Sequence, residues 1–150
     1  MGSIPFWPRF LGFSGLLPQA ACAIVVWVGP TSWHGAALGI AVLYAGLILT
    51  FLGGMWWGIA AAAPAAERRR TLRWLWIAAV LPNFVAMACL GPWALDMVGV
   101  EPSLIMLASA VLLSLGIDVR LDQLSPRWWM ALRVPLSIGL ATATFLCAFA

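Results

Sequence analysis

The chain of 150 residues is 64% hydrophobic and 9% charged, with a mean hydropathy of +1.02. Because so few polar side chains cannot coat a soluble domain of this length, the composition excludes a soluble globular protein and predicts an integral membrane protein. The formal net charge is +3. The basic residues, which are all arginine, follow the predicted membrane topology rather than forming a binding stripe. We therefore expect no nucleic-acid partner.

The first apolar run, residues 10–28, is about 19 residues long and predicts a helix of roughly 28 Å, close to the thickness of a bilayer core. Residues 1–8 are expected to form a juxtamembrane segment before it. A cleaved signal peptide is the alternative, since Arg9 precedes the run and Ala21-Cys22-Ala23 resembles a cleavage site. The run continues to Val28, however, which favours a retained span.

Four further apolar runs predict the remaining spans, at residues 35–63, 72–90, 103–117 and 128–149. We expect a turn between the first two spans, because Gly29-Pro30 breaks regular structure, and we expect Gly91-Pro92 to end the third span. The fourth run is short for a membrane span. Residues 1–150 are thus predicted to form a single all-α domain, a bundle of five transmembrane helices.

The distribution of arginine supports five spans. With five, all eight arginines fall on one side of the membrane, which the positive-inside rule makes cytoplasmic. Without the short fourth span, three of them would move to the opposite side. We therefore predict a cytoplasmic N-terminus, an external C-terminus and location in a bacterial inner membrane. The arginines are Arg9, Arg68, Arg69, Arg70, Arg73, Arg120, Arg127 and Arg133.

Small residues recur at every fourth position of the second span, which predicts one helix face suited to close packing. We expect this helix to lie at the centre of the bundle. The predicted helix-packing residues are Gly46, Gly53, Gly54, Gly58 and Ala62, with Thr50 on the same face.

Two amides at similar depth suggest a midplane pocket. Gln19 and Asn83 each follow a proline, and both are predicted near the middle of the bilayer. Such an arrangement suits a ligand pocket. Hydrogen bonds between helices explain the two amides equally well, and an aromatic belt at the membrane interface explains the tryptophans. We prefer this structural interpretation. The ten tryptophans include many near predicted helix ends. The candidate ligand-binding residues are Gln19, Tyr44, Thr50, Trp56, Trp57 and Asn83.

Catalysis, ion coupling and metal binding are not indicated. We expect all five carboxylates (Glu67, Asp96, Glu101, Asp118 and Asp122) to lie in loops or at helix ends, which argues against ion-coupled transport. The sequence contains no catalytic motif, so we expect a protein that is not an enzyme. Cys22, Cys89, Cys147 and His34 lack metal-ligand spacing, so no metal is predicted, and no cofactor is indicated.

The loop before the fifth span combines opposite charges with aromatic residues. Asp122 is expected to pair with Arg127 or Arg133, and Trp128 and Trp129 to anchor the helix that follows. We assign this cluster a structural role.

Four stretches of the chain carry a family resemblance: Leu11–Pro18, Tyr44–Gly58 with its Phe-Leu-Gly-Gly-x-x-Trp-Gly core, Val80–Pro82 and Pro126–Arg133. They resemble the small five-span membrane proteins catalogued as domain of unknown function 3429. The chain departs from that family's pattern at Gln19, Trp56 and Trp129. The resemblance implies a fold and a membrane location, and it implies no activity.

Two functions are consistent with these features. The first is a non-enzymatic accessory or scaffold protein, whose small-residue groove docks another membrane protein or a second copy of the chain. The alternative is binding or transport of an apolar ligand, porphyrin-, sterol- or quinone-like, in the midplane pocket. That alternative rests on a similarity in architecture to the tryptophan-rich sensory protein family, which is also small, five-span and rich in tryptophan.

Overall fold

The computed structural model describes residues 4–63, 72–121 and 124–150, and within these ranges all regular structure is helical. The helices are α1 (Phe6–Ser14), α2 (Leu17–Val28), α3 (Thr31–Ala62), α4 (Arg73–Ala94), α5 (Val100–Leu121) and α6 (Trp129–Ala148). Five helical segments are long and apolar enough to cross a membrane, with α1 and α2 together forming the first. The predicted all-α bundle of five transmembrane helices is confirmed.

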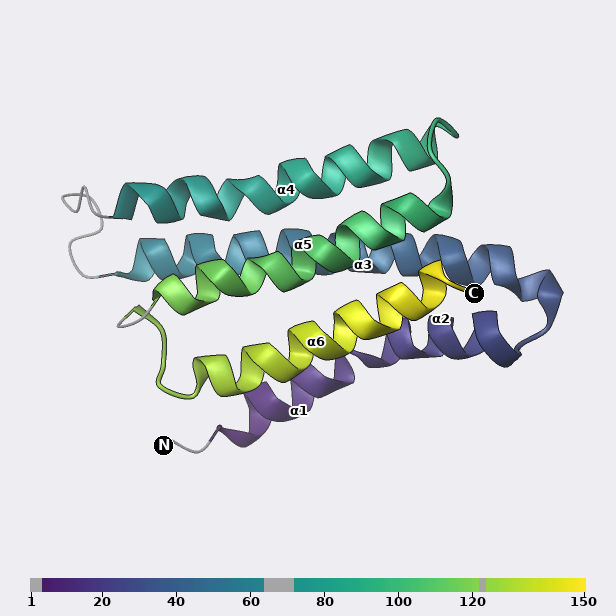
Figure 1. Cartoon of the computed structure of the whole chain (residues 1–150). Coiled ribbons are helices and arrows are strands. Elements are labelled where there is room, and N and C mark those ends of the chain that lie inside the picture. Colours follow the sequence, from purple (N-terminus) through teal and green to yellow (C-terminus); the bar gives the residue numbers. More distant parts are fainter. Residues whose placement is uncertain (1–3, 64–71, 122–123) are drawn as a thin grey trace.

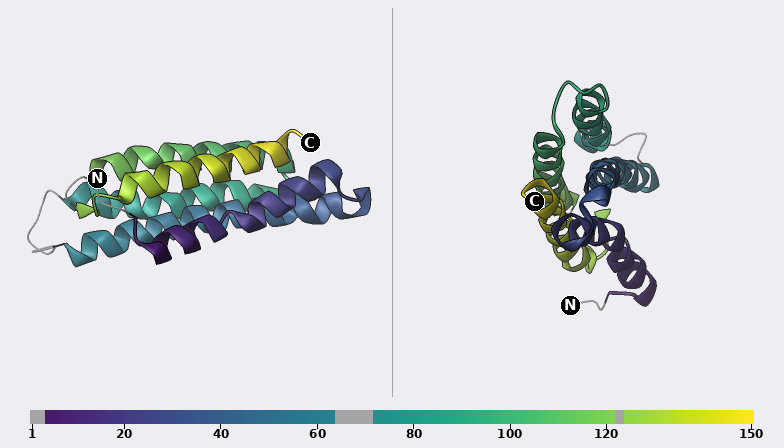
Figure 2. Two further views of the ribbon diagram at one scale, coloured as in Figure 1. Left: turned by 90° about the horizontal axis from the view of Figure 1, so that it is seen from below. Right: turned by 90° about the vertical axis from the view of Figure 1, so that its right-hand side faces the viewer.

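The helices run lengthwise side by side, and consecutive spans run in opposite directions (Figure 1). Viewed along the helices, the bundle is elongated, with α4 at one edge and α1 at the other (Figure 2). Helix α3 contacts α2, α4, α5 and α6, whereas α1 contacts chiefly α6. The prediction that the second span is the central helix agrees with this arrangement.

The first span is broken, which corrects the prediction of one helix over residues 10–28. It begins at Phe6, so part of the expected juxtamembrane segment is helical, and it is interrupted at Gly15 and Leu16. The physical reason is Pro18, which has no N–H to continue the hydrogen-bond ladder across the break. The hydroxyl of Tyr44 on α3 donates a hydrogen bond to the carbonyl oxygen of Gly15 at this break.

Three other boundaries also differ from the prediction. Helix α3 begins at Thr31, inside the expected turn, and α4 continues through Gly91-Pro92 to Ala94. Helix α5 extends from Val100 to Leu121, so the fourth span is not short. Pro102 is tolerated there because N–H groups in the first turn of a helix have no intrahelical partner. The fifth span matches the predicted range to within one residue at each end.

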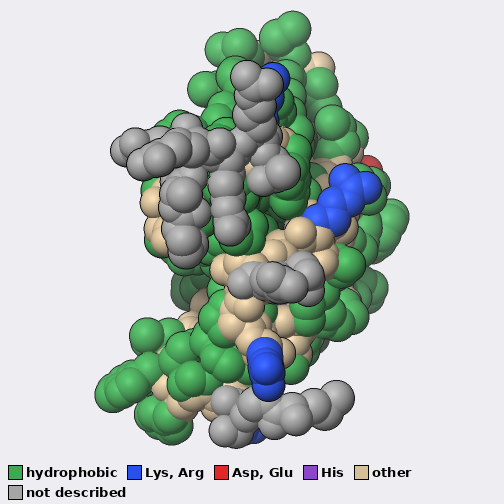
Figure 3. Space-filling view, turned by 90° about the vertical axis from the view of Figure 1, so that its left-hand side faces the viewer, with side chains coloured by type: hydrophobic (Ala, Val, Ile, Leu, Met, Phe, Trp, Pro, Cys, Tyr) green, Lys and Arg blue, Asp and Glu red, His purple; other side chains and the backbone are tan. Residues whose placement is uncertain are grey.

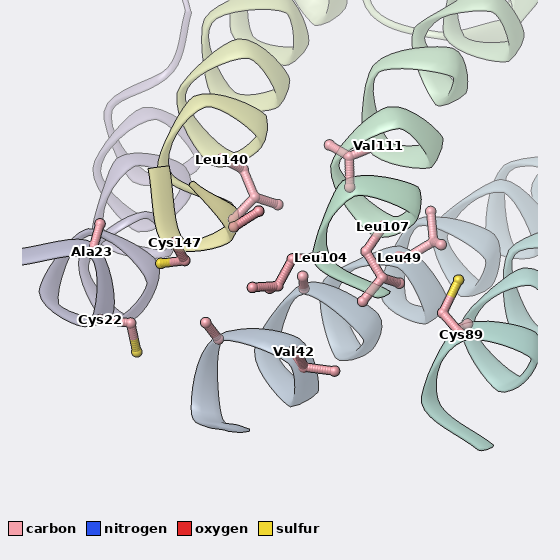
Figure 4. Packing of buried hydrophobic residues seen from close by; sticks show 14 residues of the cluster. Cys22, Ala23, Val42, Leu49, Cys89, Leu104, Leu107, Val111, Leu140 and Cys147 are labelled. Atoms are coloured by element: carbon pink, nitrogen blue, oxygen red, sulfur yellow. The ribbon is translucent and has the colours of Figure 1, made fainter. Parts of the chain in front are cut away.

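The core consists of two clusters of buried apolar side chains. The larger joins α2, α3, α4, α5 and α6, and Figure 4 shows Leu104 and Leu107 of α5 beside Val42 and Leu49 of α3. The second lies toward the other end of the bundle and centres on Trp56, which has no exposed surface.

The packing face of α3 is offset from the predicted one. Three of its buried small residues, Gly46, Gly53 and Ala60, are spaced seven residues apart, and Ala37, Ala41 and Ala45 are buried as well. A Cβ at Gly53 would lie 2.4 Å from the carbonyl oxygen of Ala79, so only glycine allows α4 to approach this closely. Gly54, Gly58 and Ala62 instead lie on the exposed side of α3, so they do not pack against the other described helices of this chain.

Basic side chains gather at the end of the bundle that holds the N-terminus. Figure 3 looks onto this end, where arginine side chains stand out against a mostly apolar surface. Arg9, Arg73, Arg120 and Arg127 belong to helix ends or loops at this end, whereas Asp96 and Glu101 lie at the other. Glu67, Arg68, Arg69 and Arg70 lie outside the described residues, so their predicted side of the membrane is not tested by the structure.

Candidate functional site

A carboxylate and a guanidinium are buried together near the arginine-rich end of the bundle. Asp118 lies on α5 and is 1% exposed, and Arg133 lies on α6 and is 7% exposed. Asp118 is directed inward because it continues the buried face of α5, which includes Val111, Ser114 and Leu121 at helical spacing. Arg133 is four residues inside α6, roughly 6 Å along the helix axis.

Both oxygens of Asp118 accept hydrogen bonds. The Nε of Arg133 lies 2.8 Å from Oδ2, and this contact is also an ion pair. The indole N–H groups of Trp56 and Trp129 donate to Oδ1 at 2.9 and 3.1 Å. Arg133 also donates from Nη2 to the Ser114 hydroxyl at 3.4 Å. We call these five residues the Asp118 cluster.

The Asp118 cluster joins three helices, because Trp56 comes from α3, Asp118 and Ser114 from α5, and Arg133 and Trp129 from α6. A buried charge without a partner is strongly destabilising, so each partner holds the other in place. Charge-assisted hydrogen bonds also require specific geometry. The cluster therefore fixes the relative positions of α3, α5 and α6 at this end.

The Asp118 cluster bears on two predictions. Asp118 was expected in a loop or at a helix end, and it lies in the last turn of α5, buried within a segment apolar enough to span a membrane. The argument against ion coupling from a lack of such carboxylates therefore no longer holds. Asp122, which was expected to pair with Arg127 or Arg133, lies outside the described residues, and Arg133 pairs with Asp118. Arg127 is exposed. Trp128 is half-buried, and its ring centroid lies 6.3 Å from that of Trp129.

A signal for this cluster is present in the sequence. Positions 104, 107, 111, 114, 118 and 121 follow the i, i+3, i+4 spacing of one helix face, and all but two of them are apolar. Extending the helix past Ile117 places Asp118 on that face. The expectation that Asp118 begins a polar loop concealed the pattern.

A cavity of about 270 Å³ lies beside the Asp118 cluster. Residues of α1 and of the α1–α2 break form one wall, and the other walls come from α3, α5 and α6. Its lining is apolar except for Arg133 and Ser137. The side chain of Ser137 is buried, and its hydroxyl has no hydrogen-bond partner among the described residues. The region thus combines an apolar space with two polar groups of α6.

The predicted ligand-binding residues do not converge on one cavity. Gln19 is buried and donates from Nε2 to the Thr144 hydroxyl at 3.0 Å, while its Oε1 has no partner in the described part of the chain. Tyr44 contacts the break in the first span. Trp56 belongs to the Asp118 cluster instead.

The other three predicted ligand-binding residues face outward to different degrees. Thr50 is half-buried, and its hydroxyl donates to the carbonyl oxygen of Leu47 in its own helix at 2.8 Å. Trp57 is 50% exposed and contacts Trp76 of α4 edge to face. Asn83 is exposed on α4.

The cysteines are buried on α2, α4 and α6, and all three are free thiols. A nitrogen of His34 lies 3.2 Å from the carbonyl oxygen of Gly29. Within residues 4–63, 72–121 and 124–150, no three His, Cys, Asp or Glu side chains are grouped so that they could hold a metal ion.

Five apolar helices with a buried charged cluster define a small multi-pass membrane protein. The chain belongs to the family described as "Protein of unknown function (DUF3429)", which it matches over residues 4–149. The family resemblance predicted from its sequence is thereby confirmed. No curated protein and no solved structure matches the chain.

Proposed function

We propose that this protein is a non-enzymatic accessory or scaffold protein of a bacterial inner membrane, with its N-terminus in the cytoplasm. It docks a transmembrane helix of another membrane protein on the outward face of α3. The observation that supports this is the position of Gly54 and Gly58, which are exposed and have no atom within 4 Å of where a Cβ would lie.

The outward face of α3 changes in character along its length. Toward the end that holds the C-terminus it carries the large exposed side chains Leu47 and Phe51. Toward the arginine-rich end it carries Gly54, Gly58 and Ala62. We call this second stretch the α3 notch. Small residues let helices approach closely in a bilayer, where packing rather than the hydrophobic effect drives their association.

The α3 notch suits a helix of a different protein, and it also suits a second copy of this chain. A hollow at one depth is complementary to a helix that carries large side chains at that depth. A second copy in the same orientation would pack glycine against glycine there, as small-residue faces do in membrane helix dimers, because Gly54 and Gly58 are spaced as a G-x-x-x-G motif.

A leucine in the notch tests this proposal. We expect a stoichiometric partner protein to co-purify with the wild-type chain from its own membranes and to be lost in Gly54→Leu. The matched control is Gly116→Leu, which places the same side chain in open space on the exposed side of α5 and should retain the partner. Thermal unfolding in detergent checks that both variants fold.

Two results would contradict the docking proposal. One is a partner retained equally in Gly54→Leu and Gly116→Leu. The other is cross-linking that detects only self-association at the notch, because an accessory role needs a different protein.

The alternative, binding of an apolar ligand, is favoured by a groove between α4 and α5. The groove has a volume of about 400 Å³, and its lining includes Trp56, Pro82 and Leu113. A flat apolar molecule of the porphyrin, sterol or quinone type would lie against Leu113 and the other accessible side chains of this groove. This alternative predicts a small mass bound one to one that is lost in Ala110→Trp, which fills the groove, and retained in Gly54→Leu.

A further inference from the structure

We propose that the cavity between α1, α3 and α6 binds the head of a neutral amphiphile, a carbonyl group attached to an apolar tail. An isoprenoid quinone and an ester-linked bilayer lipid both have this chemistry. The inference is independent of the docking function, because the cavity and the α3 notch involve different residues.

The shape of the cavity suits a head group with a tail that leaves it. Leu11 of α1 and Phe51 of α3 line the cavity and are also 59% and 66% exposed, so the cavity opens toward the bilayer between these helices. Deeper in, Leu52 and Leu140 are 2% and 3% exposed and close the inner wall. The head group of the ligand therefore fits inside the cavity, and its tail extends into the lipid, without displacement of a helix.

A residue with an unpaired hydroxyl lies in the wall of this space. Ser137 is 1% exposed and lines the cavity, and within the described ranges its hydroxyl has no partner. It lies eight residues into α6, roughly 12 Å along the helix, where the bilayer provides no water. A buried polar group without a partner is costly and calls for an explanation. A ligand carbonyl that accepts a hydrogen bond from this hydroxyl provides one.

The charge of the site selects a neutral head. Arg133 also lines the cavity, but its charge is already balanced by Asp118 at 2.8 Å. An anionic ligand would place a second negative charge against one guanidinium in a region of low dielectric. A carbonyl adds no charge. Arg133 has five N–H donors, and its contacts with Asp118 and Ser114 use two of them, so it retains donors for a ligand carbonyl.

Two variants at Ser137 and two matched controls test the site in the full chain in detergent micelles. Ser137→Ala removes the donor, and Ser137→Leu also fills the cavity. The controls are Ser109→Ala and Ser109→Leu, because Ser109 lines the other groove and its hydroxyl already bonds the carbonyl oxygen of Ile105 at 2.8 Å. Thermal unfolding checks that all four variants fold.

Native mass spectrometry measures the binding of two probes. One is a benzoquinone that carries a decyl tail, and the other is ester-linked phosphatidylethanolamine, compared with its ether-linked analogue, which lacks the carbonyl. We expect one-to-one binding of at least one carbonyl probe by the wild-type protein. That binding should be roughly fivefold weaker in Ser137→Ala and more than tenfold weaker in Ser137→Leu. Both Ser109 variants should bind like the wild type.

The outcomes distinguish the two sources of the carbonyl. Ser137-dependent binding of the benzoquinone identifies a quinone site. Ser137-dependent binding of the ester lipid, without binding of the ether lipid, identifies a lipid site. The proposal is overturned if neither carbonyl probe binds, if the ether lipid binds as well as the ester lipid and the benzoquinone does not bind, or if the Ser109 variants weaken binding as much as the Ser137 variants.

Discussion

Two buried polar sites differ in how completely their groups are paired. In the Asp118 cluster, the carboxylate receives hydrogen bonds from three side chains on two other helices. In the pair of Gln19 and Thr144, one hydrogen bond of 3.0 Å joins α2 to α6, and no partner for Oε1 of Gln19 is present in the described residues. A buried charge needs a full set of partners, whereas a neutral amide is tolerated with fewer. The charged site should therefore be the more sensitive to substitution.

The largest effect is expected from Asp118→Ala. It leaves the Arg133 charge buried without its partner, which should lower the free energy of unfolding by about 3–5 kcal/mol. Titration with SDS in mixed micelles measures the change. The double variant Asp118→Leu with Arg133→Met removes both charges and should recover most of the loss. If the double variant is as unstable as Asp118→Ala, the ion pair is not the source of the effect.

The two tryptophans of the cluster provide a graded test. Trp56→Phe removes one of the two indole donors to Oδ1 and leaves a small void in the core, so it should cost about 2 kcal/mol. Trp129→Phe removes a longer bond from a half-buried ring and should cost about 1 kcal/mol. The same SDS titration ranks them. Equal losses of unfolding free energy in the two variants would mean that burial of the indole ring does not determine how much these hydrogen bonds contribute to stability.

At the other site, Thr144→Val should cost about 1 kcal/mol. The substitution keeps the shape of the side chain but leaves the Nε2 group of Gln19 without its acceptor, and hydrogen bonds between membrane helices are worth roughly this much. Ser109→Ala, whose hydroxyl bonds only within its own helix, is the control and should change stability by less.

The smallest effect is expected from Gln19→Leu, at about 0.6 kcal/mol or less. It removes the donor and the unpaired Oε1 together, and Thr144 still donates to the carbonyl oxygen of Leu140 at 2.8 Å. A loss above that of Thr144→Val would show that Gln19 has a further partner, which would weaken the contrast between the two sites.

The number of spans could be predicted from the sequence because hydrophobic length decides it. Each span needs an apolar run that crosses the bilayer, and backbone groups in lipid must be paired within a helix. Boundaries were harder to predict. Pro102 looks like a breaker, yet it lies in the first turn of α5, where proline is tolerated, and α4 continues for two residues past Pro92.

The face of α3 that packs inward could not be predicted. Gly53 and Gly54 are adjacent, and each belongs to a regular series of small residues, one spaced by seven and one by four. Which series is buried depends on where α4 lies, and that is set by contacts such as the one between Gly53 and Ala79. Local spacing on α5 carries a signal for the burial of Asp118, but the partners of Asp118 come from α3 and α6, whose proximity local spacing does not encode.

Helix α1 has a consequence for how the protein responds to its membrane. None of its residues is buried, so lipid rather than protein provides most of its surroundings, and yet it forms one wall of the cavity beside Arg133. A helix supported in this way tilts to match the thickness of the bilayer. We therefore expect the width of the cavity to depend on acyl-chain length, which makes membrane thickness a variable that controls access to Ser137.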